Sequence, residues 1–290
     1  MMLRSLLFIP GNSPSMLQNA DVLGADAYII DLEDAVSPKE KDAARLLVIN
    51  AIKALDFDKN KTIVRVNPLH TEDCTVDIQA IVPLAPAFIM PTKVSCAEDI
   101  IKISELIELI EEKSKLEIGR TKLIPLIETA EGIENAYHIA NSSDRIAALF
   151  LGAEDLTSDM QAIRTKQGNE IAYARSRIVT AARACNIEAI DTPFTDAHDY
   201  EGLIEDARIA RSLGFTGKAS ISPHHVEGIN KAFTPTYEEI NYAKNVIEAI
   251  EEGKRLGKGA VSLGGKMIDR PIVLRAQKLL NVAKQLGMEN

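Results

Sequence analysis

Residues 147–156 read AALFLGAEDL, a run of small and apolar side chains that ends abruptly at Glu154 and Asp155. A continuous apolar run of this length is typical of a parallel strand that is buried on both faces. Two further stretches end in the same way: LIPLIETAEG at 123–132 and AYIIDLEDAV at 27–36. The pattern predicts buried strands that deliver acidic residues to one edge of a sheet.

Strand-like runs recur along most of the chain, and segments with helical periodicity lie between them. They are found at 5–10, 27–32, 62–67, 87–90, 123–127, 146–151, 187–191 and 219–222. Eight strands alternating with helices at spacings of about 25 to 40 residues predict the α/β class and a (β/α)8 TIM barrel, which typically needs about 250 residues. A doubly wound open sheet is the alternative.

Three helices have recognisable ends. SPKE at 37–40 and SCAE at 95–98 have the spacing of a capping box, with Ser37 and Ser95 as N-caps. Asp196 is expected to cap a helix that ends at Gly214.

The last part of the chain falls outside the eight units. We expect residues 1–233 to form the barrel and residues 234–290 to form a C-terminal helical extension that packs on a neighbouring subunit. The extension consists of a charged helix, a glycine-rich break at 257–266 and a final helix.

Composition excludes several classes of protein. The 290 residues are 46% hydrophobic and 26% charged, as in ordinary globular domains, and a formal net charge of −9 disfavours binding to nucleic acid or to an anionic membrane surface. The three cysteines are widely spaced and predict neither a disulfide framework nor a zinc site. No stretch reads as a signal peptide or a membrane span, so we expect a cytoplasmic protein.

The acids at the strand ends predict a metal site. In a barrel these ends share one rim, where several carboxylates repel one another unless a cation neutralises them. Oxygen donors favour Mg²⁺, with Mn²⁺ as a substitute. In the simpler alternative, Asp34, Glu128 and Asp155 cap the helices that follow them, although Thr129 is a better cap than Glu128.

Other polar residues near the strand ends have two interpretations each. Arg65 either binds a substrate carboxylate or forms an ion pair with a rim acid. Lys93 is either a solvated lysine or a Schiff-base lysine that the nearby acids would keep protonated. His224 and His225 are expected in the first turn of a surface helix, and Asp269 is well placed to cap the last helix.

Several blocks of the chain, in order, resemble the citrate lyase beta subunit and its relatives, the citramalyl- and malyl-thioester lyases of the HpcH/HpaI-type aldolase superfamily. The blocks are RSLLFIPGN, GADAYIIDLEDAVSPKEKDAAR, TIVRVNP, LIPLIETAEGIENA, LGAEDLTSDM, YARSRIVTAARACNIEAIDTPFTD, LGFTGKASISP and GKMIDRPIVLRA. They span nearly the whole chain.

This resemblance implies a barrel that assembles as trimers or hexamers and uses magnesium to cleave a carbon–carbon bond in an acyl thioester. It implies that Glu128 and Asp155 bind the metal and that Arg65 holds the keto-acid end of the substrate. Asp269 would act as acid/base from a neighbouring subunit. The other residues that it places at the site are Glu33 and Asp34, which would orient water, and Gly152, Ala153 and Glu154, which with Glu128 would contact substrate.

The resemblance leaves the substrate open among citryl, citramalyl and malyl thioesters, carried by coenzyme A or by an acyl carrier protein. The family usually reads Ile-His-Pro or Ile-Asn-Pro where this chain has Ser222, near the expected carrier site. Two alternatives remain: an aldolase of class II type acting on free hydroxy-keto acids, and a subunit active only with its acyl carrier protein and other citrate lyase subunits.

Overall fold

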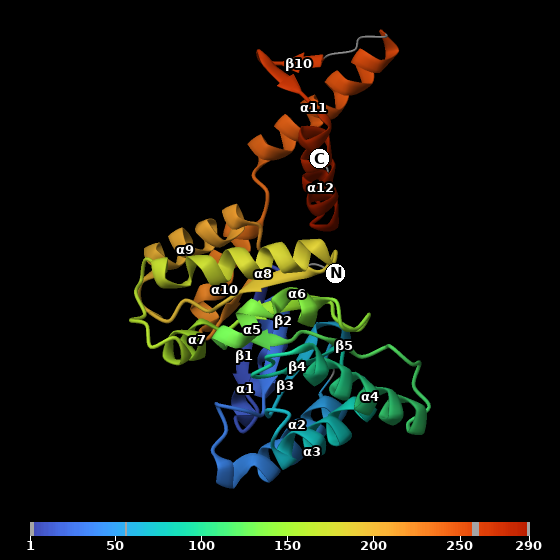
Figure 1. Ribbon diagram of the computed structural model, residues 1–290, viewed down its shortest axis with the longest axis vertical. Coiled ribbons are helices and arrows are strands. Elements are labelled where there is room, and N and C mark those ends of the chain that lie inside the picture. Colours follow the sequence, from blue (N-terminus) through green and yellow to red (C-terminus); the bar gives the residue numbers. More distant parts are fainter. Residues whose placement is uncertain (1–2, 56, 257–260, 289–290) are drawn as a thin grey trace. The chain divides into compact units, whose positions relative to one another are not determined.

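The computed structural model describes residues 3–55, 57–256 and 261–288, which fall into two compact units. The first unit is Leu3–Lys231, and the second lies within Ala232–Asn290 (Figure 1). Each unit has its own hydrophobic cluster.

A parallel sheet forms the centre of the first unit. Its strands are β1 (Ser5–Pro10), β2 (Ala27–Asp31), β3 (Thr62–Val66), β4 (Phe88–Pro91), β5 (Lys122–Leu123), β6 (Leu126–Ile127), β7 (Ala148–Leu151), β8 (Glu188–Asp191) and β9 (Gly217–Ser220). Their order is β5-β4-β3-β2-β1-β9-β8-β7-β6, and every pairing is parallel. The predicted α/β class and parallel sheet are confirmed.

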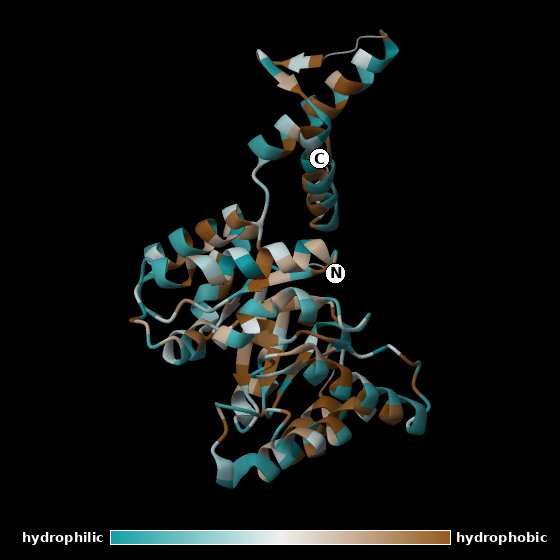
Figure 2. Ribbon diagram, viewed as in Figure 1, coloured by the Kyte–Doolittle hydropathy of each residue, from teal (hydrophilic) through white to brown (hydrophobic). Residues whose placement is uncertain are grey.

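The strands are buried as their continuous apolar sequences predicted. Every residue of β2, β3, β4 and β7 is buried. One cluster collects side chains from around the sheet, including Leu6 of β1, Ile63 of β3, Phe150 of β7 and Ile190 of β8. Figure 2 shows the hydrophobic residues concentrated in these central strands, whereas the surrounding helices carry both kinds of residue.

The predicted fifth strand, 123–127, is divided into β5 and β6 by Ile124 and Pro125. Proline has no N–H to donate to a sheet. Hydrogen bonds connect this segment to both of its neighbours: Ile124 N donates to Ile89 O (3.0 Å), and Ala147 N donates to Leu123 O (2.9 Å). Closure of the nine-strand order into an eight-stranded barrel stays a prediction.

Helices connect the strands of the first unit. They are α1 (Pro14–Gln18), α2 (Lys41–Ala54), α3 (Glu72–Ile81), α4 (Ala97–Lys113), α5 (Ala130–Glu134), α6 (Ala136–Ala140), α7 (Ala153–Asp159), α8 (Ala172–Ala184), α9 (Tyr200–Leu213) and α10 (Pro223–Phe233). Short 3₁₀ turns are η1 (Ala20–Val22), η2 (Pro38–Glu40), η3 (Lys59–Lys61), η4 (Val82–Leu84) and η5 (Asn169–Ile171).

The predicted helix caps were partly wrong. Ser37 precedes η2, and its hydroxyl bonds the Glu40 carboxylate (2.9 Å) in place of a backbone N–H. The second capping box lies one residue later than expected, at Cys96 and Asp99. The cap of α9 is Asp199, not Asp196, because a turn at 196–199 delays the helix start. The end of α9 at Gly214, with φ +106°, is as predicted.

The second unit contains α11 (Tyr237–Arg255), β10 (Val261–Leu263), β11 (Lys266–Ile268) and α12 (Arg270–Gln285). Part of the expected glycine-rich break is instead an antiparallel hairpin, because Gly264 and Gly265, both with positive φ, supply a tight turn between β10 and β11. Residues 257–260 of that break lie outside the described residues. Across 3–55, 57–256 and 261–288, no helix is both long and apolar enough to cross a membrane.

We predict that Gly217→Ala destabilises the first unit by about 3 kcal/mol, as expected for overpacking. A Cβ at this position would lie 1.7 Å from the Leu3 carbonyl oxygen, where β9 pairs with β1. Gly24→Ala is the matched control, since its φ of +73° strains alanine but no atom lies within 4 Å of the added carbon. Urea unfolding of both variants tests this prediction, and an equal loss of unfolding free energy in the two variants would contradict it.

Candidate active site

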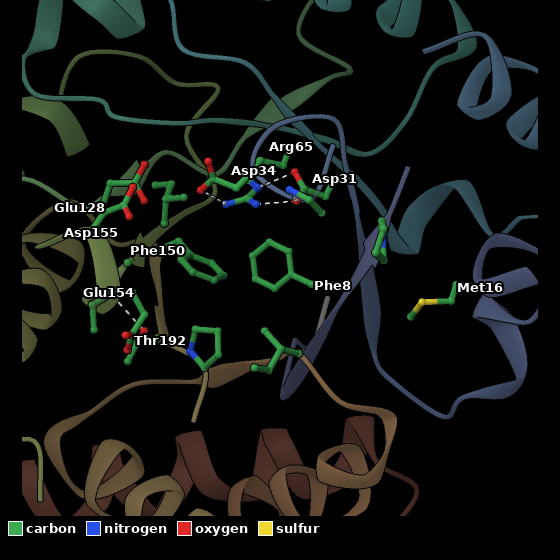
Figure 3. A pocket seen from close by; sticks show the side chains of 17 residues that line it. Phe8, Met16, Asp31, Asp34, Arg65, Glu128, Phe150, Glu154, Asp155 and Thr192 are labelled. Atoms are coloured by element: carbon green, nitrogen blue, oxygen red, sulfur yellow. Dashed lines mark hydrogen bonds and ion pairs between the residues drawn. The ribbon is translucent and has the colours of Figure 1, made fainter. Parts of the chain in front are cut away.

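A cavity of about 520 Å³ opens at the carboxyl ends of the strands in the first unit (Figure 3). Its lining includes seven of the nine expected site residues; the five with charged side chains are Asp34, Arg65, Glu128, Glu154 and Asp155. Gly152 and Ala153 also line it, as do Phe8, Pro10, Met16, Asp31, Ala35, Leu126, Phe150, Thr192, Pro193 and Ile221. The tertiary structure therefore brings together acids that are more than 100 residues apart in the sequence.

Glu128 directly follows β6 and is only 4% exposed. It is not a helix cap, because the Thr129 hydroxyl caps α5 by accepting the Gly132 N–H. Gly152 packs against its side chain: a Cβ on Gly152 would lie 2.8 Å from Glu128 Cβ and 2.9 Å from Oε2. The glycine thus provides the space that the carboxylate occupies.

Asp155 lies in the first turn of α7, whose N-cap position is Gly152. It is therefore not an N-cap either, and Figure 3 shows its carboxylate beside that of Glu128. Burial, and next the negative charge of Asp155, raise the pKa of Glu128 to about 8. Two adjacent carboxylates, one of them buried, favour binding of a proton or a cation.

Arg65, at the end of β3, forms an ion pair with a rim acid, which was one of its two predicted roles. Its Nε and Nη2 donate to the two oxygens of Asp31 at 2.7 and 2.5 Å. Burial acts to lower the pKa of this guanidinium, but the Asp31 carboxylate outweighs it and the pKa is raised. The Phe8 ring lies under the guanidinium, 4.9 Å from Cζ to centroid.

The remaining nitrogen of Arg65, Nη1, points toward two other acids. It lies 3.2 Å from Glu33 Oε2 and 3.9 Å from Asp34 Oδ2. The Glu33 contact is an ion pair without hydrogen-bond geometry, and Glu33 Oε2 accepts no hydrogen bond from the described residues. Burial raises the pKa of Glu33, partly offset by Arg65.

Asp31 organises this part of the site, although the sequence interpretation gave it no role. It is 2% exposed, and besides Arg65 it accepts the backbone N–H groups of Glu33 (2.8 Å) and Ala35 (3.0 Å). One buried carboxylate therefore fixes both the guanidinium and the turn that carries Glu33. The signal in the sequence was its position as the last residue of a buried strand.

Lys93 is exposed, as one of its two predicted roles requires, and it is also ion-paired with acids of the site. Its Nζ lies 3.3 Å from Glu33 Oε1 and 3.8 Å from Asp155 Oδ2. Burial acts to lower its pKa, but Glu33 outweighs this and the pKa is raised, so the amine stays charged.

The strand-end carboxylates fit a hard divalent cation. Within the described parts of the chain, no group of three or more His, Cys, Asp or Glu side chains could hold a metal ion by itself. Glu128 and Asp155 are a pair of oxygen donors on a cavity wall. Such a pair suits Mg²⁺, which commonly takes one or two protein carboxylates and fills its other positions with water and substrate.

The start of α7 is held by a residue that the sequence interpretation missed. The Thr192 hydroxyl, after β8, accepts the Ala153 N–H (3.1 Å), and the Thr192 carbonyl accepts from the buried Lys218 Nζ (2.7 Å). Lys218 belongs to a buried cluster of two cations and two acids, completed by Arg175, Asp191 and Asp206. Glu154, in the same turn of α7, accepts a hydrogen bond from Arg164: the distance from Arg164 Nε to Glu154 Oε1 is 3.0 Å.

The remaining expected residues lie away from the lining. Ser222 is buried just before α10, and His224 and His225 lie in the first turn of this surface helix, as predicted. His224 is exposed, whereas the side chain of His225 is 1% exposed and faces Phe194. Asp269 lies in the second unit, is exposed, and caps α12 by accepting the Ile272 N–H (3.1 Å).

Comparison with known proteins identifies relatives over nearly the whole chain. The family model described as HpcH/HpaI aldolase/citrate lyase matches residues 4–223. The citrate lyase subunit beta of Leuconostoc mesenteroides subsp. cremoris is 44% identical, covering 97% of this chain and 93% of that protein. The mitochondrial citramalyl-CoA lyase of Rattus norvegicus is 32% identical, covering 98% and 86%.

A solved structure resembles the fold. CitE from Mycobacterium tuberculosis, in complex with magnesium, acetoacetate and coenzyme A, is 29% identical with a TM-score of 0.81 and covers 98% of both chains. The match of the family model, together with relatives of this identity and coverage, shows that the chain belongs to the HpcH/HpaI aldolase/citrate lyase family.

Proposed function

We propose that the protein is a magnesium-dependent carbon–carbon lyase that cleaves a citryl thioester, or a citramalyl or malyl thioester, to a 2-keto acid and an acetyl thioester. The main support for this function is that Glu128, Asp155 and Arg65 line the same cavity. The relatives support it, since they are named citrate lyase subunit beta, citramalyl-CoA lyase and L-malyl-CoA/beta-methylmalyl-CoA lyase.

Glu128 and Asp155 are the residues that would hold Mg²⁺, or Mn²⁺ in its place. A bound ion would lower the pKa of the substrate hydroxyl and polarise the carbonyl that forms from it. In the cleavage the hydroxyl proton would pass to water oriented by Glu33 and Asp34, and the O–H electrons would form the carbonyl of the keto acid. The electrons of the broken carbon–carbon bond would pass to the acetyl thioester as an enolate, which then takes up a proton from Asp269.

Arg65 is the protein side chain that we assign to stabilising negative charge on the substrate. Its Nη1 is the nitrogen without a hydrogen bond to Asp31, so we assign it to the keto-acid oxygen of the substrate. Because Asp31 fixes the guanidinium in advance, little reorganisation is needed as charge develops on that oxygen. Phe8 and Phe150, packed edge to face at 6.0 Å, give the cavity an apolar wall that excludes water.

Glu33 and Asp34 are assigned to orienting water, and Glu154 with Gly152 and Ala153 to contacting substrate. Asp269 is assigned to protonating the enolate. We propose that it does so in the cavity of a neighbouring subunit within a trimer or hexamer, through the C-terminal extension at 234–290. The exposure of Asp269 is consistent with that role.

We also propose that the sheet is a closed (β/α)8 barrel in which β5 and β6 are two halves of one strand. Only Ile124 and Pro125 separate them, although they stand at opposite ends of the strand order. Closure would place all the strand-end acids around one rim.

Turnover of purified protein is the direct test of the lyase assignment. We expect magnesium-dependent release of oxaloacetate from citryl-CoA or of pyruvate from citramalyl-CoA, abolished by EDTA. Activity that appears only with an acyl carrier protein and partner subunits would assign the chain to a complex. Equal cleavage of a free hydroxy-keto acid without a thioester would instead support an aldolase of class II type.

Asp269→Asn should lower kcat by at least about 100-fold, a typical contribution of a general acid. The asparagine oxygen can still accept the Ile272 N–H, so the thermal midpoint should stay near that of wild type, and oxaloacetate binding should be nearly intact. Loss of the helix cap alone, as in Asp269→Ala, would lower the free energy of unfolding by about 1 kcal/mol. Normal turnover by the asparagine variant would remove Asp269 from the scheme.

Magnesium binding should tighten as the pH rises from 6 to about 8. In this window the raised pKa of Glu128, about 8, means that the metal must displace a proton. The same shift makes the metal-free fold lose stability as pH rises through this range, since the folded state holds a proton that the unfolded state has released. Calorimetry at several pH values tests this, and Glu128→Gln should weaken binding and remove most of its pH dependence.

A further inference from the structure

Lys93 has an unusual backbone conformation at the edge of the site. It follows β4 by two residues and has φ +53°, in the left-handed region that non-glycine residues seldom adopt. In this conformation its N–H donates to Glu128 Oε1 at 2.9 Å. Strain of about 1–3 kcal/mol, typical of such a residue, persists where the surroundings enforce it, commonly at functional sites.

The side chain of the same residue contacts two further acids. Its ammonium lies between Glu33 Oε1 (3.3 Å) and Asp155 Oδ2 (3.8 Å), and the side chain is 38% exposed. Lys93 also lines a second, smaller cavity of about 260 Å³, whose wall includes both Glu128 and Asp155. One residue therefore contacts both proposed metal ligands, one through its backbone and the other through its charge.

We propose that Lys93 tunes the metal site: its backbone N–H orients Glu128, and its ammonium competes with the metal ion for the negative charge of Asp155. This inference rests on the proposed metal site at Glu128 and Asp155. It gives Lys93 a positioning and affinity-setting role in place of a covalent one.

The sign of the effect follows from electrostatics. A positive charge 3.8 Å from a carboxylate oxygen repels a divalent cation that binds the same carboxylate. Solvent around the half-exposed pair weakens this repulsion but does not remove it. When Asp155 binds the metal, the ammonium keeps Glu33 as a partner. A neutral residue at this position should therefore bind the metal more tightly than lysine does.

The test is titration of EDTA-treated full-length protein with MgCl₂ by calorimetry, without substrate. Lys93→Met keeps the backbone N–H and much of the side-chain volume but removes the charge, so the dissociation constant should fall about threefold to tenfold. Lys93→Arg keeps the charge and should bind Mg²⁺ within about twofold of wild type. Lys102→Met, an exposed position on α4, removes one positive charge elsewhere and should change nothing.

The Mg²⁺-induced rise of the thermal midpoint provides a second readout, and it should be larger in Lys93→Met than in wild type. Lys93→Asn serves as a second neutral variant, since asparagine tolerates the left-handed conformation. Damage to the fold cannot imitate the expected result, because it would weaken metal binding rather than tighten it. Unchanged or weaker binding by both neutral variants would overturn the role of Lys93 alone. Absence of Mg²⁺ binding by wild type would instead overturn the metal site, and the role of Lys93 with it.

Discussion

The placement of negative charge at the ends of buried strands is the constraint on which the site depends. Asp31 is almost completely buried, and leaving it unpaired would cost several kcal/mol. Arg65 neutralises it through two short hydrogen bonds. That pair fixes the guanidinium on the Phe8 ring and holds the turn that carries Glu33, so the cation side of the site is built before any ligand arrives.

The second group of acids in the same cavity presents the complementary problem. Glu128 and Asp155 face the cavity with too little positive charge nearby, and the raised pKa of Glu128 reports that imbalance. Gly152 provides the space for the carboxylate and Lys93 directs one of its oxygens. These two groups of charged residues are the reason why the proposed divalent cation and an oxyanion-bearing substrate would suit the same cavity.

Much of this arrangement was predictable from apolar runs and the residues that end them. The runs predicted the buried parallel strands and the acids at their carboxyl ends, and the preference for Thr129 over Glu128 as the cap of α5 was correct. The predictions of helix caps failed where a small local change in the path of the chain decides which residue begins the helix. Asp199 caps α9 because a turn delays the helix, and the second capping box lies at Cys96 and Asp99, one residue later than expected.

The sequence by itself determined the buried strands of the first unit, their parallel direction and the family, since these depend on apolar runs and on motifs that are local in the chain. Only the tertiary structure decided which acids are neutralised within the chain and which are left for a ligand. Asp31 and Glu128 end similar strands, yet one is paired with Arg65 and the other faces Asp155. The physical reason is that charge pairing depends on distances between strands, and the sequence does not contain those distances.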